Sequence, residues 1–198
     1  MGETDKHRRI MTALIEALIA FFKNIAGVYV SGNLMLYYEE GNPSACVSPD
    51  VFVIRGVGKN ERRVYKLWEE VNAPDVVIEI TSRSTRLEDL GNKRALYAEL
   101  GVAEYFIYDP NQEYLKPPLQ GYRLAQNDYA PIAPDAQGKF HSAILNLDLQ
   151  IVNDNLRLFN PHTQKFLLTP LEAQEAVEQA ETENARLRAE LKKLREEK

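Results

Sequence analysis

The sequence predicts an α/β (α+β) domain in which helices flank a mixed central sheet, followed by a C-terminal helix. Apolar residues recur at helical spacing in residues 7–24 and 85–100, which predicts two helices that each pack one face on a core. Short β-branched and aromatic runs, separated by Gly, Asn and Pro, predict strands between and after these helices. The 198 residues, 44% of them hydrophobic, suffice for one domain of residues 1–169 and a small appendage of residues 170–198.

The composition restricts the compartment and the partners. The net charge is −5, so a nucleic-acid partner would have to be held by a local basic patch and not by the overall field. Cys46 is the single cysteine, which excludes an internal disulfide and fits a reducing cytosol. No apolar run approaches the roughly 18 residues of a membrane span. We therefore expect a cytoplasmic protein with no membrane partner.

The first part of the chain is expected to be a helix followed by an antiparallel meander. The helix of residues 7–24 ends before Gly27 and has one apolar face: Met11, Leu14, Ile15, Leu18, Ile19 and Phe22. Four short apolar runs suit the meander: Val28–Val30, Leu34–Tyr38, Ala45–Val47 and Val51–Ile54. The stretch RGVGKNERRVYKLWEE follows as a surface hairpin or loop. Its basic side chains form either a solvated face or a basic patch: Lys59, Arg62, Arg63 and Lys66.

A strand, a helix and a second strand form a βαβ-like unit in the middle of the chain. The segment PDVVIEITS predicts a strand, and the sequence TRLE at residues 85–88 has the spacing of a capping box that starts a helix ending near Leu100. Residues 105–108 form the second strand. In such a unit the strands are parallel neighbours with the helix packed across them. Four further strands are expected within residues 121–159, with the sequences GYRL, YAPI, LDLQIV and LRLF.

Glu79 is the unusual residue of the first strand in this unit. Side chains alternate between the two faces of a strand, so one face is purely apolar: Val76, Ile78 and Ile80. The other face carries Glu79 together with Asp75, Val77 and Thr81. A buried and unpaired carboxylate costs several kcal/mol. Glu79 therefore needs a structural salt bridge, a hydrogen-bond network or a metal ion.

Asp50 and Lys93 can complete a site with Glu79. Asp50 begins another apolar strand, in SPDV, and Mg²⁺ takes oxygen ligands from only one or two protein carboxylates. Taken alone, Asp50 is equally typical of turn chemistry. On the next helix Asp89, Lys93 and Tyr97 are four residues apart on one stripe, from which Lys93 can reach the carboxylates. The alternative is a surface pair between Asp89 and Lys93, which contributes little to stability.

Four motifs follow one another in the chain at suitable separations: SPDV, PDVVIEITS-x-ST, a D-x₃-K-x₃-Y helix and LGVAEYFIYDP. Together they resemble the Uma-type family, a branch of the PD-(D/E)XK nuclease-like superfamily, over roughly residues 28–110. The resemblance implies a restriction-endonuclease-like fold and a metal site that takes Mg²⁺, with Mn²⁺ as a substitute. It also implies hydrolysis of phosphodiester bonds, for which DNA is the expected substrate and RNA is the alternative.

The resemblance also implies roles for particular residues. Asp50, Glu79 and the backbone carbonyl of Ile80 would be metal ligands, and Lys93 would be the catalytic lysine. Asp89 and Tyr97 would support it.

The sequence departs from the superfamily pattern at one position. The superfamily usually places its lysine two residues after the strand acid, where this chain has Thr81. The resemblance is consistent with a lysine that has moved to the helix as Lys93. Asp75 shares a face with Glu79 but lies at the mouth of the strand, so we expect a turn residue first and a ligand second. The scattered His7, His141 and His162 have no zinc spacing.

The C-terminal segment has the heptad pattern of a short coiled coil. The a positions are Val177, Asn184 and Leu191, and the d positions are Ala173, Ala180, Leu187 and Leu194. Asn at an a position favours a parallel dimer, and Glu183 with Arg188 and Glu190 with Arg195 are attractive pairs across it. We expect a homodimer that the globular domain reinforces. The alternative is a single amphipathic tail helix.

The sequence therefore leaves two functions open. The first is a metal-dependent DNA endonuclease that uses Asp50, Glu79 and Lys93. The second is a catalytically inactive nuclease-like fold that acts as a dimeric binding or assembly module. The retained carboxylates and lysine favour the enzyme, whereas Thr81 and the acidic balance favour the module.

Overall fold

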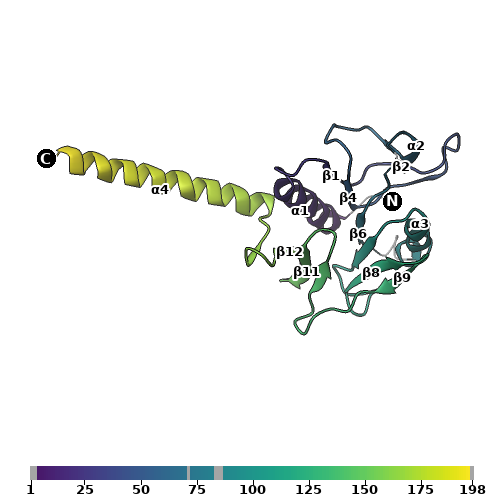
Figure 1. The fold of residues 1–198 in the computed structure, drawn as a ribbon. Helices are drawn as coiled ribbons and strands as arrows, with labels where there is room; N and C mark the ends of the chain where they lie inside the picture. The colour runs from purple at the N-terminus through teal and green to yellow at the C-terminus, as the bar shows by residue number, and fades with distance from the viewer. Residues whose placement is uncertain (1–3, 71, 83–86, 197–198) are drawn as a thin grey trace. The chain divides into compact units, whose positions relative to one another are not determined.

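The computed structural model describes residues 4–70, 72–82 and 87–196, and it separates into the units Met1–Leu167 and Leu168–Lys198 (Figure 1). The helices are α1 (Asp5–Phe21), α2 (Leu67–Glu70), the π-helical turn η1 (Glu88–Asn92), α3 (Lys93–Glu99) and α4 (Pro170–Glu196). The strands are β1 (Val28–Ser31), β2 (Leu36–Tyr37), β3 (Cys46–Val47), β4 (Val51–Arg55), β5 (Tyr65–Lys66), β6 (Val76–Ile80), β7 (Glu104–Tyr108), β8 (Leu119–Ala125), β9 (Asp128–Pro131), β10 (Phe140–Ser142), β11 (Leu147–Val152), β12 (Asn155–Asn160) and β13 (Lys165–Phe166). Within the described ranges, no helix has the length and apolar content of a membrane span.

A mixed six-stranded sheet organises the first unit. Its order is β1-β4-β6-β7-β8-β9, with β6 and β7 parallel and the other neighbours antiparallel. The parallel pair with η1 and α3 between its strands confirms the expected βαβ unit, as well as the mixed sheet flanked by helices. The capping box expected at residues 85–88 lies partly outside the described residues.

The antiparallel meander expected for residues 28–54 is wrong. β1 pairs with β4 in the large sheet, whereas β2 pairs with β3 and β5 in a separate three-stranded sheet. The chain leaves the large sheet directly after β1, at Gly32 and Asn33. Asn33 has φ 49°, a left-handed conformation that interrupts a strand. β5 and α2 also replace part of the loop expected at residues 55–70.

Gly32 permits a close backbone crossing next to Asp50. A Cβ atom at Gly32 would lie 2.0 Å from the carbonyl oxygen of Asp50 and 2.6 Å from Cδ1 of Ile15. The adjacent Asn33 amide donates to the carbonyl oxygen of Pro49 at 2.8 Å. The absence of a side chain at Gly32 therefore lets the end of β1, helix α1 and the start of β4 converge.

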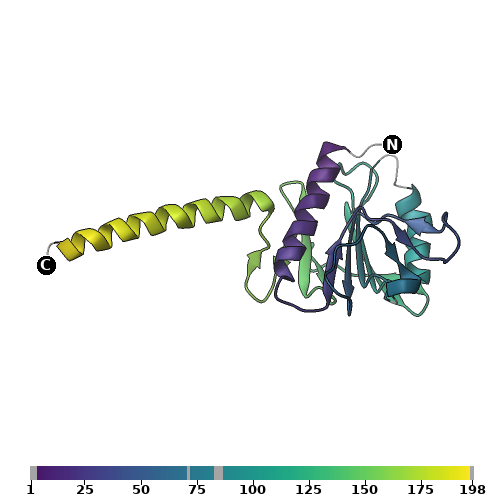
Figure 2. The ribbon, with the colours of Figure 1, turned by 90° about the horizontal axis from the view of Figure 1, so that it is seen from above.

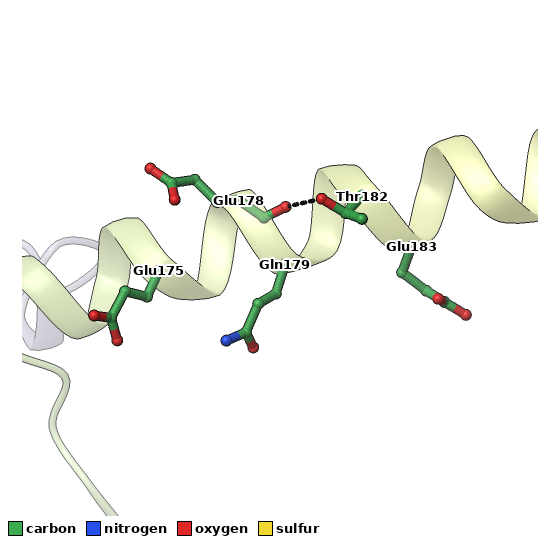
Figure 3. Close-up of a pocket in the computed structure, with 5 residues that line it drawn as sticks. All are labelled: Glu175, Glu178, Gln179, Thr182 and Glu183. Atoms are coloured by element: carbon green, nitrogen blue, oxygen red, sulfur yellow. Dashed lines mark hydrogen bonds between the residues drawn. The ribbon is translucent and has the colours of Figure 1, made fainter.

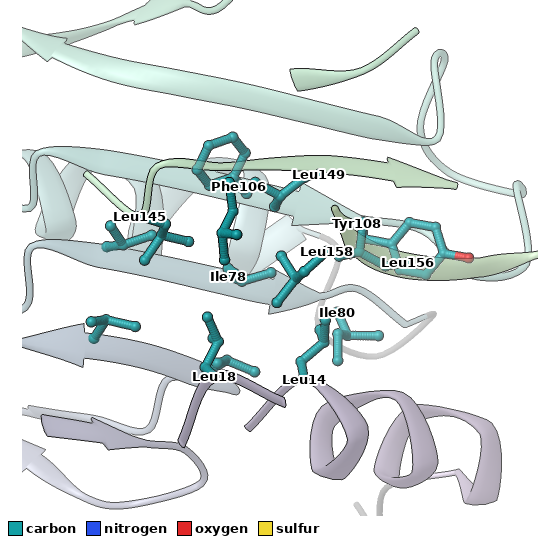
Figure 4. Packing of buried hydrophobic residues seen from close by; sticks show 14 of the residues in the cluster. Leu14, Leu18, Ile78, Ile80, Phe106, Tyr108, Leu145, Leu149, Leu156 and Leu158 are labelled. Carbon is teal, nitrogen blue, oxygen red and sulfur yellow. The ribbon is translucent and has the colours of Figure 1, made fainter. Parts of the chain in front are cut away.

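Two apolar clusters cover the two faces of the large sheet. Helix α1 lies along one face together with the second sheet of β10 to β13, and α3 with the three-stranded sheet covers the other (Figure 2). Figure 4 shows Ile78 and Ile80 of β6 in the first cluster, near Leu14 and Leu18 of α1. Val77 belongs to the second cluster. The alternation predicted for β6 is confirmed, and Glu79 lies on the face of the second cluster.

Candidate active site

Asp50 and Glu79 face each other where β4 begins and β6 ends. The antiparallel register pairs Val51 with Ile78, so the preceding Asp50 comes opposite Glu79. The Asp50 amide lies 3.4 Å from Oε2 of Glu79, and the Ile80 amide donates to Oδ2 of Asp50 at 2.7 Å. The structure therefore brings two carboxylates from adjacent strands together at one edge of the sheet.

Lys93 reaches this edge from the helix. Its Nζ lies 3.1 Å from Oε1 of Glu79 and 3.0 Å from Oδ1 of Asp89. The lysine side chain is 11% exposed and both carboxylates are fully buried, so the alternative of a surface pair between Asp89 and Lys93 is wrong. The amide of Lys93 donates to the carbonyl oxygen of Glu88 and closes the π-helical turn that carries Asp89. Turns of this kind are frequent at functional sites.

Two tyrosine hydroxyls contact the residues that carry the buried carboxylates, Glu79 and Asp89. The hydroxyl of Tyr97, in α3, donates to Oε1 of Glu79 at 2.6 Å. The hydroxyl of Tyr105, in β7, donates to the backbone carbonyl of Asp89 at 2.9 Å. Tyr97 and Lys93 both contact Oε1, which leaves Oε2 of Glu79 directed toward Asp50. The three residues of the D-x₃-K-x₃-Y stripe are therefore linked: Asp89 contacts Lys93, and Lys93 and Tyr97 both contact Glu79.

The electrostatics of the site are dominated by burial and by an excess of carboxylates. Burial and the neighbouring Asp50 raise the pKa of Glu79 well above its usual range. Burial acts to lower the pKa of Lys93, but Glu79 and Asp89 outweigh it, so the pKa lies above its ordinary value and the side chain stays a cation. Burial and Glu79 also raise the pKa of the Tyr97 hydroxyl. One ammonium among three carboxylates leaves the site with a net negative charge.

Helix α1 contributes His7, a residue that the sequence reasoning left unassigned. The Nε2 atom of His7 lies 3.0 Å from Oδ2 of Asp50, and His7 is buried. The sequence does contain a signal for this position, because His7 precedes Met11 by four residues and Leu14 by seven, on the buried stripe of α1. That spacing could have placed the histidine in the interior, although not its partner.

The remaining expected site residues lie elsewhere or have structural partners. Asp75 begins the other end of β6, where it accepts hydrogen bonds from the Arg55 amide at 2.6 Å and from the Arg55 guanidinium at 3.4 Å. It is therefore not brought together with Glu79. Thr81 is buried beyond the end of β6, and its Oγ1 has no hydrogen-bond partner among the described residues.

Two other buried carboxylates are committed to the fold. Glu104 contacts Arg123 at 2.9 Å and accepts hydrogen bonds from the Ser142 hydroxyl and the Ala143 amide, which ties β7 to the second sheet. Asp109 accepts three backbone amides of the following loop, from residues 111, 114 and 115. Glu104 and Asp109 are therefore used by the fold, whereas Glu79 and Asp50 also face each other across two strands.

The basic side chains near residues 59–66 also serve the fold. Lys59 donates to the carbonyl oxygens of Phe22 and Lys23 at the end of α1. Arg62 forms two hydrogen bonds with Glu70, at 2.6 and 2.8 Å. Lys59 and Arg62 therefore have partners within the fold, which reduces the number of basic side chains available to a nucleic acid.

The donor set at the sheet edge fits a hard divalent cation. The contacts of Asp50 with the described residues use Oδ2, which leaves Oδ1. Glu79 uses Oε1 for Lys93 and Tyr97, and its Oε2 has a long contact of 3.4 Å with the Asp50 amide. No group of three or more His, Cys, Asp and Glu side chains with the arrangement of a metal site occurs among the described residues. Mg²⁺ needs only one or two carboxylates, because water and carbonyl oxygens complete its shell.

Comparisons with known proteins identify the family of the chain. The model of the Uma2 family, described as "Putative restriction endonuclease", matches residues 1–153. A crystal structure from Anabaena variabilis, titled as a "putative nuclease belonging to DUF820", matches with a TM-score of 0.51 at 17% identity, over 69% of this chain and 73% of that chain. No curated protein matches the sequence. The structural likeness shows a shared fold, and the family match covers most of the chain. The chain therefore belongs to the Uma2 family of restriction-endonuclease-like proteins.

Proposed function

We propose that the chain is a metal-dependent endonuclease that hydrolyses phosphodiester bonds in DNA. The observation that carries the proposal is the contact of Lys93 with Glu79, at 3.1 Å, beside Asp50. The site contains two carboxylates on adjacent strands and a lysine from the next helix. These are the groups to which the family resemblance assigns metal binding and catalysis. A site used only for structure would gain nothing from a second carboxylate facing the first.

Asp50, Glu79 and the backbone carbonyl of Ile80 would hold Mg²⁺, and Mn²⁺ could replace it. The ion would supply positive charge against the scissile phosphate and acidify the attacking water. The negative site favours such a cation. Burial and then repulsion from Asp50 raise the pKa of Glu79, and the charge of the cation would offset that repulsion. Asp89 and Tyr97 would keep Lys93 and Glu79 in place.

Lys93 would act as a fixed positive charge. Because its pKa lies above the ordinary value, the amine stays protonated at neutral pH and cannot accept the proton of the attacking water. Its three N–H donors suit a phosphate oxygen or a water at the edge of the site. We therefore assign to Lys93 the stabilisation of charge that develops on the phosphate.

The proposal is tested by cleavage of supercoiled plasmid and of single-stranded DNA and RNA with Mg²⁺ or Mn²⁺. Asp50→Asn keeps an oxygen for the Ile80 amide but removes the ligand charge, so we expect at least about a hundredfold slower cleavage. A chelator should abolish cleavage by the wild type. Asp75→Asn is the matched control and should cleave normally, because Asp75 pairs with Arg55. Absence of cleavage by a folded wild type that also fails to bind Mn²⁺ would contradict the proposal.

Dimerisation is part of the same proposal and gives the alternative function its support. α4 spans 27 residues and begins with a capping box, in which Thr169 and Glu172 exchange hydrogen bonds of 2.8 and 3.3 Å. Val177, Leu187 and Leu191 are exposed on the helix, as the expected seam requires. Leu194 lies outside the described side chains. If no substrate is cleaved, a dimeric assembly module is the function that this seam favours.

The opposite face of α4 is polar. The shallow hollow in Figure 3 is lined by side chains of this one helix, which diverge into solvent: Glu175, Glu178, Gln179, Thr182 and Glu183. Four of them occupy b, c and f positions, and Glu183 is the g position expected to pair with Arg188 of a second copy. The helix is therefore amphipathic in the sense that a parallel dimer needs.

We expect the full chain to sediment as a homodimer at micromolar concentration. Replacing both Leu187 and Leu191 with Asp buries charge in the seam and should raise the dissociation constant by more than about tenfold. Glu178→Gln, on the polar face, is the control and should leave the dimer intact. A wild type that sediments as a monomer would contradict the seam.

A cytoplasmic location stays part of the proposal, and the free Cys46 is consistent with it.

A further inference from the structure

We propose that His7 is a positioning residue that fixes the Asp50 carboxylate for cation binding; this inference rests on the proposed metal-dependent function. His7 lies in the first turn of α1, far from Asp50 in the sequence. Its Nε2 lies 3.0 Å from Oδ2 of Asp50, and only 8% of its side chain is exposed. A polar ring is costly in the interior unless it forms a hydrogen bond, so this contact is a specific feature of the site.

The direction of the hydrogen bond follows from the neighbours of Asp50. An ionised carboxylate only accepts hydrogen bonds, so a stable contact requires a proton on Nε2 of His7. Oδ2 of Asp50 also accepts the Ile80 amide at 2.7 Å. Two donors from different elements thus converge on one oxygen. They fix the rotation of the carboxylate and leave its other oxygen, Oδ1, for a cation.

The backbone around His7 is held in place on several sides. The hydroxyl of Thr4 accepts the His7 amide at 3.2 Å and caps the helix. Lys6 donates to the carbonyl oxygen of Pro110 and to Oδ1 of Asn111, which anchors the same turn to the loop after β7. Gly32 lets the start of β4 approach α1 closely. Because its backbone is held in place, His7 can hold the Asp50 carboxylate in one orientation.

Hydrogen-bond partners of ligating carboxylates are worth a measurable share of metal affinity. Loss of such a partner typically lowers the affinity about 10- to 100-fold. An apolar side chain at position 7 would fit the buried stripe of α1 equally well, since its neighbours on that stripe are Ile10, Met11 and Leu14. The stability of the fold therefore does not call for histidine, whereas the orientation of Asp50 does.

The test measures Mn²⁺ affinity of the full chain without DNA, from the electron paramagnetic resonance signal of unbound Mn²⁺. We expect His7→Leu to weaken Mn²⁺ binding by about 10- to 100-fold with a similar melting temperature. His7→Gln places an amide N–H at comparable reach and should restore most of the affinity. His141→Leu is the matched control. His141 lies 2.7 Å from Asp148 and does not contact the proposed ligands, so this variant should bind Mn²⁺ like the wild type.

Cleavage assays add a second readout. In His7→Leu the Mn²⁺ concentration for half-maximal cleavage should rise, and the rate at saturating Mn²⁺ should approach that of the wild type. Equal Mn²⁺ affinity in the wild type, His7→Leu and His7→Gln would overturn the positioning role and leave the nuclease proposal standing. If His7→Leu does not fold, His7→Gln decides alone, and an affinity loss as large as that of Asp50→Asn would overturn the role of the N–H donor. A folded wild type that binds no Mn²⁺ would overturn both proposals.

Discussion

Glu79→Gln is expected to abolish metal-dependent cleavage and, at neutral pH, to stabilise the fold. Glutamine keeps the oxygen that accepts the Tyr97 hydroxyl but has no charge for a cation. Metal ions supply several kcal/mol to such reactions, and 1.36 kcal/mol is a factor of ten, so cleavage should fall by roughly a thousandfold or more. The site would keep its shape and lose its activity.

The expected gain in stability follows from the raised pKa of Glu79. A group whose pKa is higher in the folded state contributes its full stability below the pKa of the unfolded chain and loses it as the pH rises through the folded pKa. Between the unfolded and folded pKa values folding requires Glu79 to take up a proton, and at higher pH it requires burial of the charge beside Asp50, so folding is opposed in both ranges. Glutamine avoids this cost, so the free energy of unfolding of Glu79→Gln should exceed that of the wild type at neutral pH.

Urea unfolding between the ordinary pKa of glutamate and neutral pH measures this difference. The gain should grow as the pH rises and shrink as the pH falls. Glu69→Gln, an exposed residue paired with Lys66, is the control and should change little. A variant that is less stable than the wild type at neutral pH would show that the ion pair with Lys93 outweighs burial and the repulsion from Asp50.

Lys93→Met is expected to cause the largest loss of stability at this site. The substitution leaves Glu79 and Asp89 buried without the cation that both of them contact. Removal of one partner from a buried ion pair typically costs about 3–5 kcal/mol. Lys66→Met, whose ammonium pairs with Glu69 at the surface, should cost far less.

The pH dependence of Lys93→Met distinguishes this cause from a general packing defect. Without Lys93 the pKa of Glu79 should rise further, because the lysine now acts to lower it. The deficit relative to the wild type should therefore be largest at neutral pH and shrink on acidification, as Glu79 takes up a proton. Cleavage should also be lost at a pH where the variant is folded. A deficit that does not change with pH would contradict the electrostatic account.

Local patterns predicted the part of the site that one βαβ unit builds. The alternation of β6 predicted the face of Glu79, and the spacing of four residues predicted that Asp89, Lys93 and Tyr97 share a stripe. Both follow from periods of two and 3.6 residues, which do not depend on the rest of the chain. The burial of the stripe was not decided by spacing alone, because it depends on which face of the helix meets the sheet.

The same local patterns did not predict which strands pair across long stretches of the sequence. The two-residue strands β2 and β3 resemble β1 and β4 in composition, so the sequence did not indicate that β1 skips them to pair with β4. The contact of His7 with Asp50 depends on that pairing and on Gly32, which brings α1 to the start of β4. The sequence therefore proposed the carboxylates and the lysine as candidate site residues but did not indicate His7 of α1.

The shared use of Lys93 by two buried carboxylates restricts how this chain can diverge. In a related chain that no longer cleaves DNA, replacement of the lysine alone would leave Glu79 and Asp89 buried without a cation and would destabilise the fold. The economical route exchanges all three positions for apolar side chains together. Related chains should therefore fall into two groups, those that keep the whole trio and those that have lost it, with few intermediates between them.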